Sequence, residues 1–480
     1  MSFVSLEFIF IFLPLCVAGY YLCPGKYRNV FLLAASLVFY AAGDIGRMHI
    51  LIISIIANYV FGLLIGREGM SKKVKLVVLI LAIGFNVVCL FGYKYLMILY
   101  GASNITMPLG LSYFTFRTVS YCLDVYWGML PANKSVTDVA LYVSFFPQIS
   151  MGPISRYKDF YKDINERGFA PDSFFAGIKR IIRGLFRKLV IADALLPALS
   201  TCFGMEASER SVLFAWMGAI DYVIQLYYDF AGYSDIAIGL GQVFGFSLPE
   251  NFNYPYASSS ITEYWSRWHI TLGAWTRDYI YTPIFRACQD KKIARLAGYM
   301  LSSFAVWLFI GLWHGLGKDN MAVYILHGMY YFILIAGERM LADYKKARRK
   351  KLGLKKKPQS AASIAMWHIY VIFAVILGQV LFNCDSISQY GGYILSMFGG
   401  AGNAICQTEA LFYLRQDVLP MIAGIIFSFP VVPYLVKAIK VSGRERIMQV
   451  LSLAAYVVML IVSFAFLFTN TYKSFVYFKF

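Results

Sequence analysis

The sequence predicts an all-α membrane protein that crosses the bilayer many times, and its composition and segment lengths both support this class. The 480 residues are 59% hydrophobic and only 15% charged, whereas about a quarter of the residues of a soluble domain are charged. Several apolar segments reach the roughly 20 residues that span a bilayer, among them "LVVLILAIGFNVVCLFGYKYL" and "VLSLAAYVVMLIVSFAFLF". We therefore expect about 11 spanning helices embedded in lipid.

The N-terminal segment, "MSFVSLEFIFIFLPLCVAGYYLCPGKYRNV", is expected to be the first span. It has neither the basic start nor the small-residue cleavage site of a secretory signal peptide, so we expect it to be retained. The net charge of +18 is typical of a membrane protein with basic loops beside its spans. No nucleic-acid partner is expected.

Charge in the loops predicts the orientation of the chain, because basic residues gather on the cytoplasmic side. Residues 342–358 hold nine Lys or Arg and one Asp, which predicts a cytoplasmic loop. Spans are expected after it at 362–383, 418–436 and 448–469. Three spans leave the C-terminus outside, and Lys26 and Arg28 after the first span place the N-terminus outside as well. The predicted location is a bacterial cell membrane, crossed many times.

We expect one membrane domain, residues 1–480. Within it we distinguish N-terminal spans at 1–106, a catalytic core at 107–341, the basic cytoplasmic loop at 342–358, and C-terminal spans at 359–480. The core is expected to end with two spans, 296–316 and 321–341, joined by an external turn.

Two stretches of the core do not look like ordinary spans. Residues 151–188 are basic and amphipathic, which favours a helix at the cytoplasmic interface, although a plain basic loop fits nearly as well. Residues 225–285 mix apolar runs with polar groups, Pro and Gly. Non-helical backbone at membrane depth must be buried in protein or line a wet cavity. This second stretch is therefore expected to form broken or re-entrant helices around a site.

The cysteines do not indicate a metal centre or a disulfide framework. All eight lack C-x-x-C spacing, and most lie in apolar runs, as small core residues do. Cys384 and Cys406 share one predicted loop, and the sequence leaves a disulfide between them open.

His314 lies shortly after the uncharged segment "AGYMLSSFAVWLFI". An imidazole at the edge of hydrocarbon is costly unless it is paired or lines a wet cavity. The predicted external turn places His314 in the outer half of the membrane, where a substrate from outside would arrive. We expect Trp313 to exclude solvent there and Gly315 to leave room for a substrate. Position alone also fits a polar residue that is merely hydrogen-bonded within the bundle.

A second histidine, His269, lies in "SITEYWSRWHITLGAWTRDYIYTP". The spacing predicts that Trp265, Trp268 and His269 share one helical face. Many ionisable groups among aromatic residues indicate a functional cavity. Candidate substrate or tunnel residues are Trp313, Trp265, Trp268, Arg267, Glu263, Asp235, Tyr233, Asn253 and Arg277. Structural pairing of the carboxylates with Arg267 or Arg277 remains an alternative.

Nearby glycines have a simpler interpretation. Gly232, Gly239 and Gly241 are expected to allow close helix packing rather than to line the cavity.

Three chemistries could use this group of polar and aromatic residues. A metal site needs three or four suitably spaced ligands, which His269 and His314 do not supply. A serine hydrolase of the G-x-S-x-G type lacks its motif here. One histidine acting as general base on a hydroxyl, beside an activated acyl group, needs no other nucleophile. This third chemistry fits best, with no metal and no resident cofactor.

Six segments together resemble the membrane-bound O-acyltransferase family of the alginate O-acetyltransferase type. They occur in the family's order across residues 107–315: "MPLGLSYFTFRTVSYCLDVYWG", "YVSFFPQISMGPISRY", "QLYYDFAGYSDIAIGLG", "PENFNYPY", "ITEYWSRWHITLGAWTRDYIYTP" and "GLWHG". The resemblance implies that His314 is the catalytic histidine and His269 the second conserved one. Ser266 stands where such proteins are expected to have Arg or Asn, which puts a donor contact at that position in doubt.

The resemblance also implies a fold and a function. The fold is a ring of helices around a thin floor pierced by a tunnel, with the donor entering from the cytoplasm and the acceptor from outside. The implied donor is acyl-CoA, as a co-substrate, and the acceptor is an extracytoplasmic polysaccharide or a secreted SGNH-type acetyltransferase partner. A related alternative is D-alanyl transfer from a carrier protein toward teichoic acids. An ion-coupled transporter would also bury His, Asp and Arg, but usually has internal repeats, and none is visible.

Overall fold

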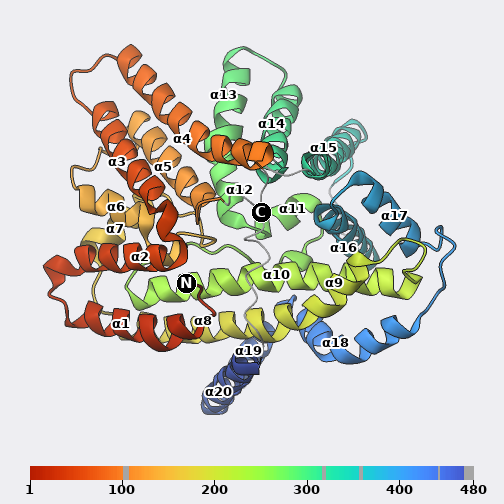
Figure 1. Cartoon of the computed structure of the whole chain (residues 1–480). Coiled ribbons are helices and arrows are strands. Elements are labelled where there is room, and N and C mark those ends of the chain that lie inside the picture. Colours follow the sequence, from red (N-terminus) through yellow and green to blue (C-terminus); the bar gives the residue numbers. More distant parts are fainter. Residues whose placement is uncertain (101–106, 316–319, 356–359, 442–443, 470–480) are drawn as a thin grey trace. The chain divides into compact units, whose positions relative to one another are not determined.

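The computed structural model describes residues 1–100, 107–315, 320–355, 360–441 and 444–469, and within these ranges the chain consists of helices and loops (Figure 1). The helices form two compact units. Unit 1 comprises Met1–Leu189, Asp229–Glu250 and Ala454–Phe480, and unit 2 comprises Val190–Tyr228 and Asn251–Leu453. Both units are therefore built from segments that are far apart in the sequence.

Unit 1 contains the N-terminal helices and the second half of the long helix α10. Its helices are α1 (Leu13–Leu22), α2 (Arg28–Asp44), α3 (Met48–Ile65), α4 (Lys72–Tyr100), α5 (Leu111–Tyr126), α6 (Val136–Ser144), α7 (Tyr157–Glu166) and α8 (Pro171–Phe186). Short π or 3₁₀ turns lie at Phe8–Phe12, Gly25–Tyr27, Ile45–Arg47 and Phe146–Gln148, and a π turn at Arg187–Ala192 runs from unit 1 into unit 2. Helix α10 (Val212–Val243) runs from unit 2 into unit 1, and so does α20 (Glu445–Thr469).

Unit 2 contains the residues around both predicted catalytic histidines. Its helices are α9 (Leu196–Gly204), α11 (Ile261–Arg267), α12 (Ile270–Thr276), α13 (Thr282–Asp290), α14 (Arg295–Gly315), α15 (Met321–Lys351), α16 (Ala361–Asn383), α17 (Ile387–Met397), α18 (Thr408–Phe427) and α19 (Val431–Val441). Short π or 3₁₀ turns lie at Asp193–Leu195, Pro255–Ala257 and Arg277–Tyr281. Helix α15 packs against α11, α14 and α16.

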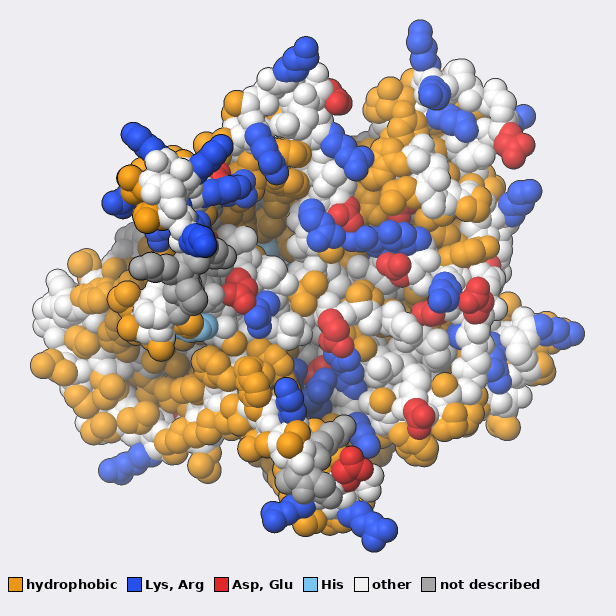
Figure 2. Space-filling model, turned by 180° about the vertical axis from the view of Figure 1, so that it is seen from behind, with side chains coloured by type: hydrophobic (Ala, Val, Ile, Leu, Met, Phe, Trp, Pro, Cys, Tyr) orange, Lys and Arg blue, Asp and Glu red, His pale blue; other side chains and the backbone are white. Residues whose placement is uncertain are grey.

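The chain is a multi-pass membrane protein. Seven helical stretches among the described residues are long and apolar enough to cross a bilayer, and they begin at residues 25, 72, 295, 321, 361, 408 and 445. The other helices are shorter or more polar. Hydrophobic side chains cover wide areas of the face seen in Figure 2, and residues such as Leu15, Leu22 and Val88 are largely exposed. Apolar surface on this scale fits contact with lipid rather than water.

The predicted spans at 362–383 and 448–469 match α16 and α20 closely. The span predicted at 418–436 is wrong in its bounds, because α18 already begins at Thr408 and ends at Phe427, before α19 starts at Val431. Pro430 and Pro433 cannot donate the backbone hydrogen bonds that would continue one helix through this point. The turn predicted after residue 316 lies mostly outside the described residues.

The two unusual stretches of the core are resolved differently. Residues 151–188 contain α7 and α8, so the helical interpretation holds and the plain loop is excluded. Residues 244–285 form short broken helices, as predicted, but residues 225–243 belong to the continuous helix α10. Cys384 and Cys406 are both free, so the disulfide that the sequence left open is not formed.

Glycine contacts hold α8 against α10 within unit 1. A Cβ atom on Gly239 would lie 2.6 Å from the carbonyl oxygen of Gly177, and one on Gly232 would lie 2.9 Å from that of Gly184. The predicted role in close helix packing is confirmed for Gly232 and Gly239, because side chains there would push the backbones of α8 and α10 apart. Gly241 packs instead against Leu248 in the loop after α10, so the prediction of helix packing is wrong for it.

In unit 2, α14 and α15 approach each other in the same way. Gly311 and Gly315 are one helical turn apart on α14, and a Cβ atom on Gly311 would lie 2.8 Å from the carbonyl oxygen of Tyr324. From the other side, a Cβ atom on Gly328 would lie 2.5 Å from the carbonyl oxygen of Trp307. This small-residue seam fixes the distance between the two helices, as in other membrane bundles.

We expect Gly328→Ala to destabilise the protein by about 1–3 kcal/mol, the usual cost of overpacking. The matched control is Gly337→Ala on the same helix, where nothing lies within 4 Å of the added atom. That change should be neutral or stabilising, since alanine is favoured over glycine in a helix by about 1 kcal/mol. Thermal unfolding in detergent micelles measures both. Equal unfolding midpoints for the two variants would show that close packing at Gly328 does not fix the distance between α14 and α15.

Candidate active site

His314 is buried near the end of α14, where aromatic side chains of three helices surround it. The centroid of its imidazole lies 4.3 Å from that of Trp313, 5.1 Å from that of Phe382 on α16, and 6.1 Å from that of Tyr324 on α15. Trp313 is itself buried. The rings keep bulk water from the imidazole, and in such surroundings a hydrogen bond is electrostatically stronger than in water.

The role predicted for Gly315 is wrong. A Cβ atom at this position would lie 3.0 Å from the Cα atom of Met321, so the space beside Gly315 is filled by α15 and not kept for a substrate. The glycine serves His314 indirectly, because it allows α15 and its aromatic side chains to approach.

His327 is a third buried histidine, which the sequence reasoning missed. Its ring lies 4.9 Å from Tyr331 and 4.9 Å from Phe382, so Phe382 packs against both His314 and His327. Its Nε2 atom is buried and has no hydrogen-bond partner in the part of the chain that the structure describes. A histidine inside an apolar helix is a costly residue, and that signal, in "ILHGMYY", would have found it.

Trp265 extends this group of rings to α11. Its ring lies 4.8 Å from Trp307 and 4.8 Å from Tyr331, both in edge-on contact. The Nε1 atom of Trp265 and the hydroxyl of Tyr331 are buried and, like Nε2 of His327, lack a hydrogen-bond partner among the described residues. We call Trp265, Trp307, His327 and Tyr331 the aromatic cluster. This cluster contains these three buried polar atoms, which lack a hydrogen-bond partner among the described residues. Its rings are connected to His314 through Phe382, which contacts both His327 and His314.

His269 lies at a break in the backbone, not on the helical face that the sequence predicts. Helix α11 ends at Arg267 and α12 begins at Ile270, with Trp268 extended and His269 in the left-handed region at φ 44°. For a residue other than glycine this conformation costs roughly 1–2 kcal/mol. Such strain persists only where the surroundings enforce it, and it gathers at functional sites.

Asn251 is the residue that enforces this conformation. Its side-chain oxygen lies 3.0 Å from Nδ1 of His269 and accepts hydrogen bonds from the backbone N–H of Thr271, at 3.3 Å, and from its hydroxyl, at 2.9 Å. Its backbone carbonyl accepts a bond from Ile270 at 2.9 Å. Because an oxygen that accepts two N–H or O–H groups also faces Nδ1, that nitrogen carries the proton. In the neutral ring, Nε2 then holds the lone pair.

The charged residues of the predicted site form local pairs. Arg267 Nη2 lies 2.7 Å from Glu263 Oε1, and Arg277 Nε lies 2.9 Å from Asp278 Oδ1. Burial raises the pKa of the Glu263 carboxyl, but hydrogen bonds from Ser259 and Arg267 outweigh it and lower that pKa. Structural pairing, the alternative that the sequence left open, therefore holds for Glu263 with Arg267.

Two further contacts fix the start and the end of α11. The carboxylate of Glu338, on α15, accepts the backbone N–H groups of Ile261 at 2.6 Å and Thr262 at 3.0 Å. At the other end, the N–H of Asn253 bonds to the carbonyl of Arg267 at 3.0 Å. Asn253 thus acts through its backbone, while its side chain is exposed.

The remaining predicted residues are divided between the units. Trp268 is buried against Phe252 and Tyr264 in unit 2, whereas Arg277 is mostly exposed. Tyr233 and Asp235 belong to unit 1, where Tyr233 contacts Ser150 and Phe3. No group of three His, Cys, Asp or Glu suited to a metal ion occurs among the described residues.

A multi-pass helical membrane protein with a buried histidine site is the class that fold and site define. The chain belongs to the membrane-bound O-acyltransferase family, whose model matches residues 132–384. It is 39% identical over 340 residues to "Probable alginate O-acetylase AlgI" of Azotobacter vinelandii, covering 66% of this chain and 67% of that protein.

Two other relatives show the breadth of the similarity. The peptidoglycan O-acetyltransferase of Helicobacter pylori is 29% identical over 529 residues, covering 98% of this chain and 96% of that protein. The teichoic acid D-alanyltransferase of Bacillus subtilis is 32% identical over 241 residues, covering 48% and 59%. The chain is thus a membrane-bound O-acyltransferase, and the transporter alternative is excluded.

We expect His327→Phe to lower acyl transfer roughly 5- to 150-fold, which corresponds to a loss of about 1–3 kcal/mol when a polar group of a bound substrate finds no partner there. The same change should leave stability unaltered or raise it, because phenylalanine keeps the ring contacts and removes a buried nitrogen without a partner. Turnover and the unfolding midpoint measure the two effects. Full activity would show that His327 is only a packing residue.

Proposed function

We propose that the chain transfers an acyl group, most simply acetyl, from acyl-CoA to a hydroxyl on the outer side of a bacterial cell membrane. The acceptor is an extracytoplasmic polysaccharide, reached directly or through a secreted SGNH-type acetyltransferase. The observation that carries the proposal is the burial of His314 among aromatic rings in a chain of this family. The similarity to proteins named alginate O-acetylase and peptidoglycan O-acetyltransferase supports the acetyl group.

His314 is the general base in this proposal. Its imidazole takes the proton of the acceptor hydroxyl while the oxygen attacks the thioester carbonyl. The carbon–sulfur bond then breaks, and the sulfur leaves as the thiolate of coenzyme A, which takes that proton from the imidazolium and so restores the neutral imidazole. Positioned general bases contribute about 10²–10⁴-fold in rate. His269, held by Asn251 with Nε2 as its acceptor nitrogen, orients a reactant near the reacting carbonyl.

Donor and acceptor meet from opposite sides of the membrane in this proposal. The basic segment 342–358 is not a loop throughout as predicted, because α15 continues to Lys351; the charge rule still assigns it to the cytoplasm, and both termini are assigned to the outside. Coenzyme A carries several negative charges, which a basic cytoplasmic face attracts. The acyl group of the bound donor reaches His314 from the cytoplasmic side and is transferred there to an acceptor that enters from outside.

A second candidate is transfer of D-alanine from a carrier protein toward teichoic acids. It is favoured by the similarity to the teichoic acid D-alanyltransferase of Bacillus subtilis, although that match covers a smaller share of both chains than the acetyltransferase matches do. Turnover with acetyl-CoA and with a D-alanyl carrier thioester, measured side by side, separates the two.

We expect His314→Ala to reduce acyl transfer about 10²–10⁴-fold, the range for loss of a general base. The unfolding midpoint should stay near that of the unchanged protein. His314→Gln, which fills more of the same space, should be equally inactive. The control is His49→Ala, at an exposed position in unit 1, which should retain full activity. If His314→Ala keeps more than half of the normal activity, His314 is not the general base.

The sidedness of the reaction is tested in vesicles of known orientation. A Lys350→Cys label on a Cys406→Ala background, read with an impermeant thiol reagent, gives the fraction with the basic segment inward. Labelled acetyl-CoA supplied on the side of that segment should yield acylated acceptor on the opposite side. Equal turnover with donor and acceptor together on the far side would refute transfer across the membrane, while leaving the acyltransferase chemistry.

A further inference from the structure

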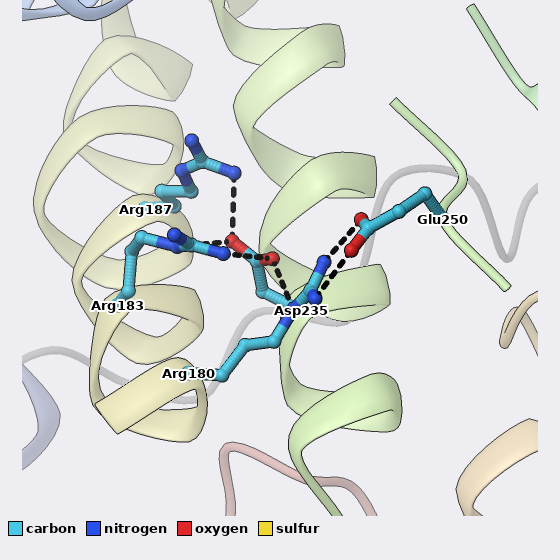
Figure 3. A network of polar contacts seen from close by, with 5 residues as sticks. All are labelled: Arg180, Arg183, Arg187, Asp235 and Glu250. Atoms are coloured by element: carbon cyan, nitrogen blue, oxygen red, sulfur yellow. Dashed lines mark hydrogen bonds and ion pairs between the residues drawn. The ribbon is translucent and has the colours of Figure 1, made fainter. Parts of the chain in front are cut away.

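Three arginines of unit 1 converge on one buried carboxylate (Figure 3). Asp235, on α10, accepts Arg180 Nε at 2.9 Å, Arg183 Nη2 at 2.8 Å and Nε at 2.9 Å, and Arg187 Nη1 at 2.7 Å. Arg180 also forms a two-pronged pair with Glu250, with its Nη1 lying 2.6 Å from Oε1. We call these five residues the arginine network. Pairing of Asp235 with Arg267 or Arg277, the alternative left open by the sequence, is excluded.

The arginines are more numerous than helix packing requires. Arg180, Arg183 and Arg187 follow one face of α8 and the turn after it, with spacings of three and four residues. The glycine contacts Gly177–Gly239 and Gly184–Gly232 already bring α8 and α10 together. One arginine would neutralise Asp235 and a second neutralises Glu250, so the network holds one more arginine than its two carboxylates require.

The network carries an excess of positive charge. Its three guanidinium groups face two carboxylates, and only Asp235 is buried, with 4% of its side chain exposed. The Glu250 side chain is 58% exposed. Burial raises the pKa of the Asp235 carboxyl, but the three arginines outweigh it and hold that pKa well below its usual range. Asp235 is therefore a permanent anion of the network, whereas Glu250 is an anion exposed to solvent that bonds to Arg180 alone among the three arginines.

The arginines also remain accessible to a ligand from solvent. The Arg183 side chain is 40% exposed, and those of Arg180 and Arg187 are 15% and 17% exposed. Arg180 presents both terminal nitrogens to the Glu250 carboxylate. A guanidinium fork of this kind suits a phosphate as well as a carboxylate, and a phosphate brings more negative charge.

We propose that Arg180, Arg183 and Arg187 form a phosphate-binding site that the Glu250 carboxylate occupies when no ligand is present. A phosphate of the acyl donor displaces Glu250 and pairs with Arg180 and Arg183, while Asp235 stays in place and holds the arginines in position. The identity of the donor as a phosphate-bearing thioester rests on the proposed function. The exchange itself does not depend on acyl transfer.

The central test compares Glu250→Gln with Asp343→Asn. Asp343 pairs with Arg339 at 3.0 Å on α15, where the side chains of Arg339 and Asp343 are 41% and 43% exposed, so each variant removes one negative charge and breaks one ion pair, but only Glu250→Gln releases an arginine of the network. Binding of coenzyme A, which has no acyl group to transfer, is measured by calorimetry in micelles. Glu250→Gln should bind coenzyme A about two- to fivefold more tightly, the fold-change that corresponds to an exposed ion pair. Asp343→Asn, in the basic segment 342–358, strengthens only the general attraction of the cytoplasmic face, so its effect should be smaller and should disappear at high salt, whereas that of Glu250→Gln should persist.

Arg183→Gln should weaken coenzyme A binding about ten- to hundredfold, the effect of losing charge-assisted hydrogen bonds. Arg183→Lys should recover part of the loss, since it keeps the charge without the fork. Pantetheine, which lacks phosphate, should bind equally to all variants, and inorganic phosphate should compete with coenzyme A better than chloride does at equal ionic strength. Nanodiscs with and without anionic lipid distinguish a phosphate of the donor from that of a lipid headgroup.

Two results would contradict the proposed phosphate-binding site. Unchanged or weaker binding in Glu250→Gln would show that Glu250 is not a competing anion. Unchanged binding in a folded Arg183→Gln would show that the network is only a structural clamp. Failure of the proposed function looks different. The binding differences would then persist with coenzyme A while the vesicles give no acylated acceptor. Turnover that proceeds while all variants bind coenzyme A alike would instead overturn the site and leave the proposed function standing.

Discussion

The close approach of helices along glycine seams is the constraint on which both polar sites depend. In unit 2 the contacts of Gly311, Gly315 and Gly328 bring α15 onto α14, and this places Tyr324 beside His314. In unit 1 the glycine pairs between α8 and α10 bring three arginines onto Asp235. Helices in lipid gain little from burying apolar surface, so packing of small residues is what lets polar groups meet.

Polar groups inside this protein fall into two kinds. Asp235 and Asn251 each accept several hydrogen bonds and fix their neighbours. The nitrogen of His327 and the hydroxyl of Tyr331 are buried without such bonds among the described residues. Leaving a buried polar atom unbonded costs about 1–3 kcal/mol. His327 and Tyr331 carry this cost close to His314, so both are candidates for contact with a substrate.

The proposed function assigns the two kinds of group to different tasks. Satisfied groups keep the protein in one geometry, so that His269 is held in a strained conformation with a defined tautomer. Unsatisfied or exchangeable groups, such as His327 and the Glu250 carboxylate, are available to a ligand. The ligand then completes hydrogen bonds in a site that is already ordered. Little binding free energy is lost in arranging the side chains, which is the advantage of a preorganised site.

The sequence by itself determined the helical membrane class and the family, because segment length, hydropathy and motif order are properties of the chain. It also predicted the histidines of "RWH" and "LWHG" as catalytic residues. Tertiary structure alone decided which groups meet. Asp235 pairs with arginines about 50 residues earlier in the chain, Gly315 admits a helix rather than a substrate, and His269 lies at a break instead of on a helical face. The structure also connects His327 to the site, because Phe382 packs against both His327 and His314. Such contacts depend on how distant helices pack, which local periodicity does not encode.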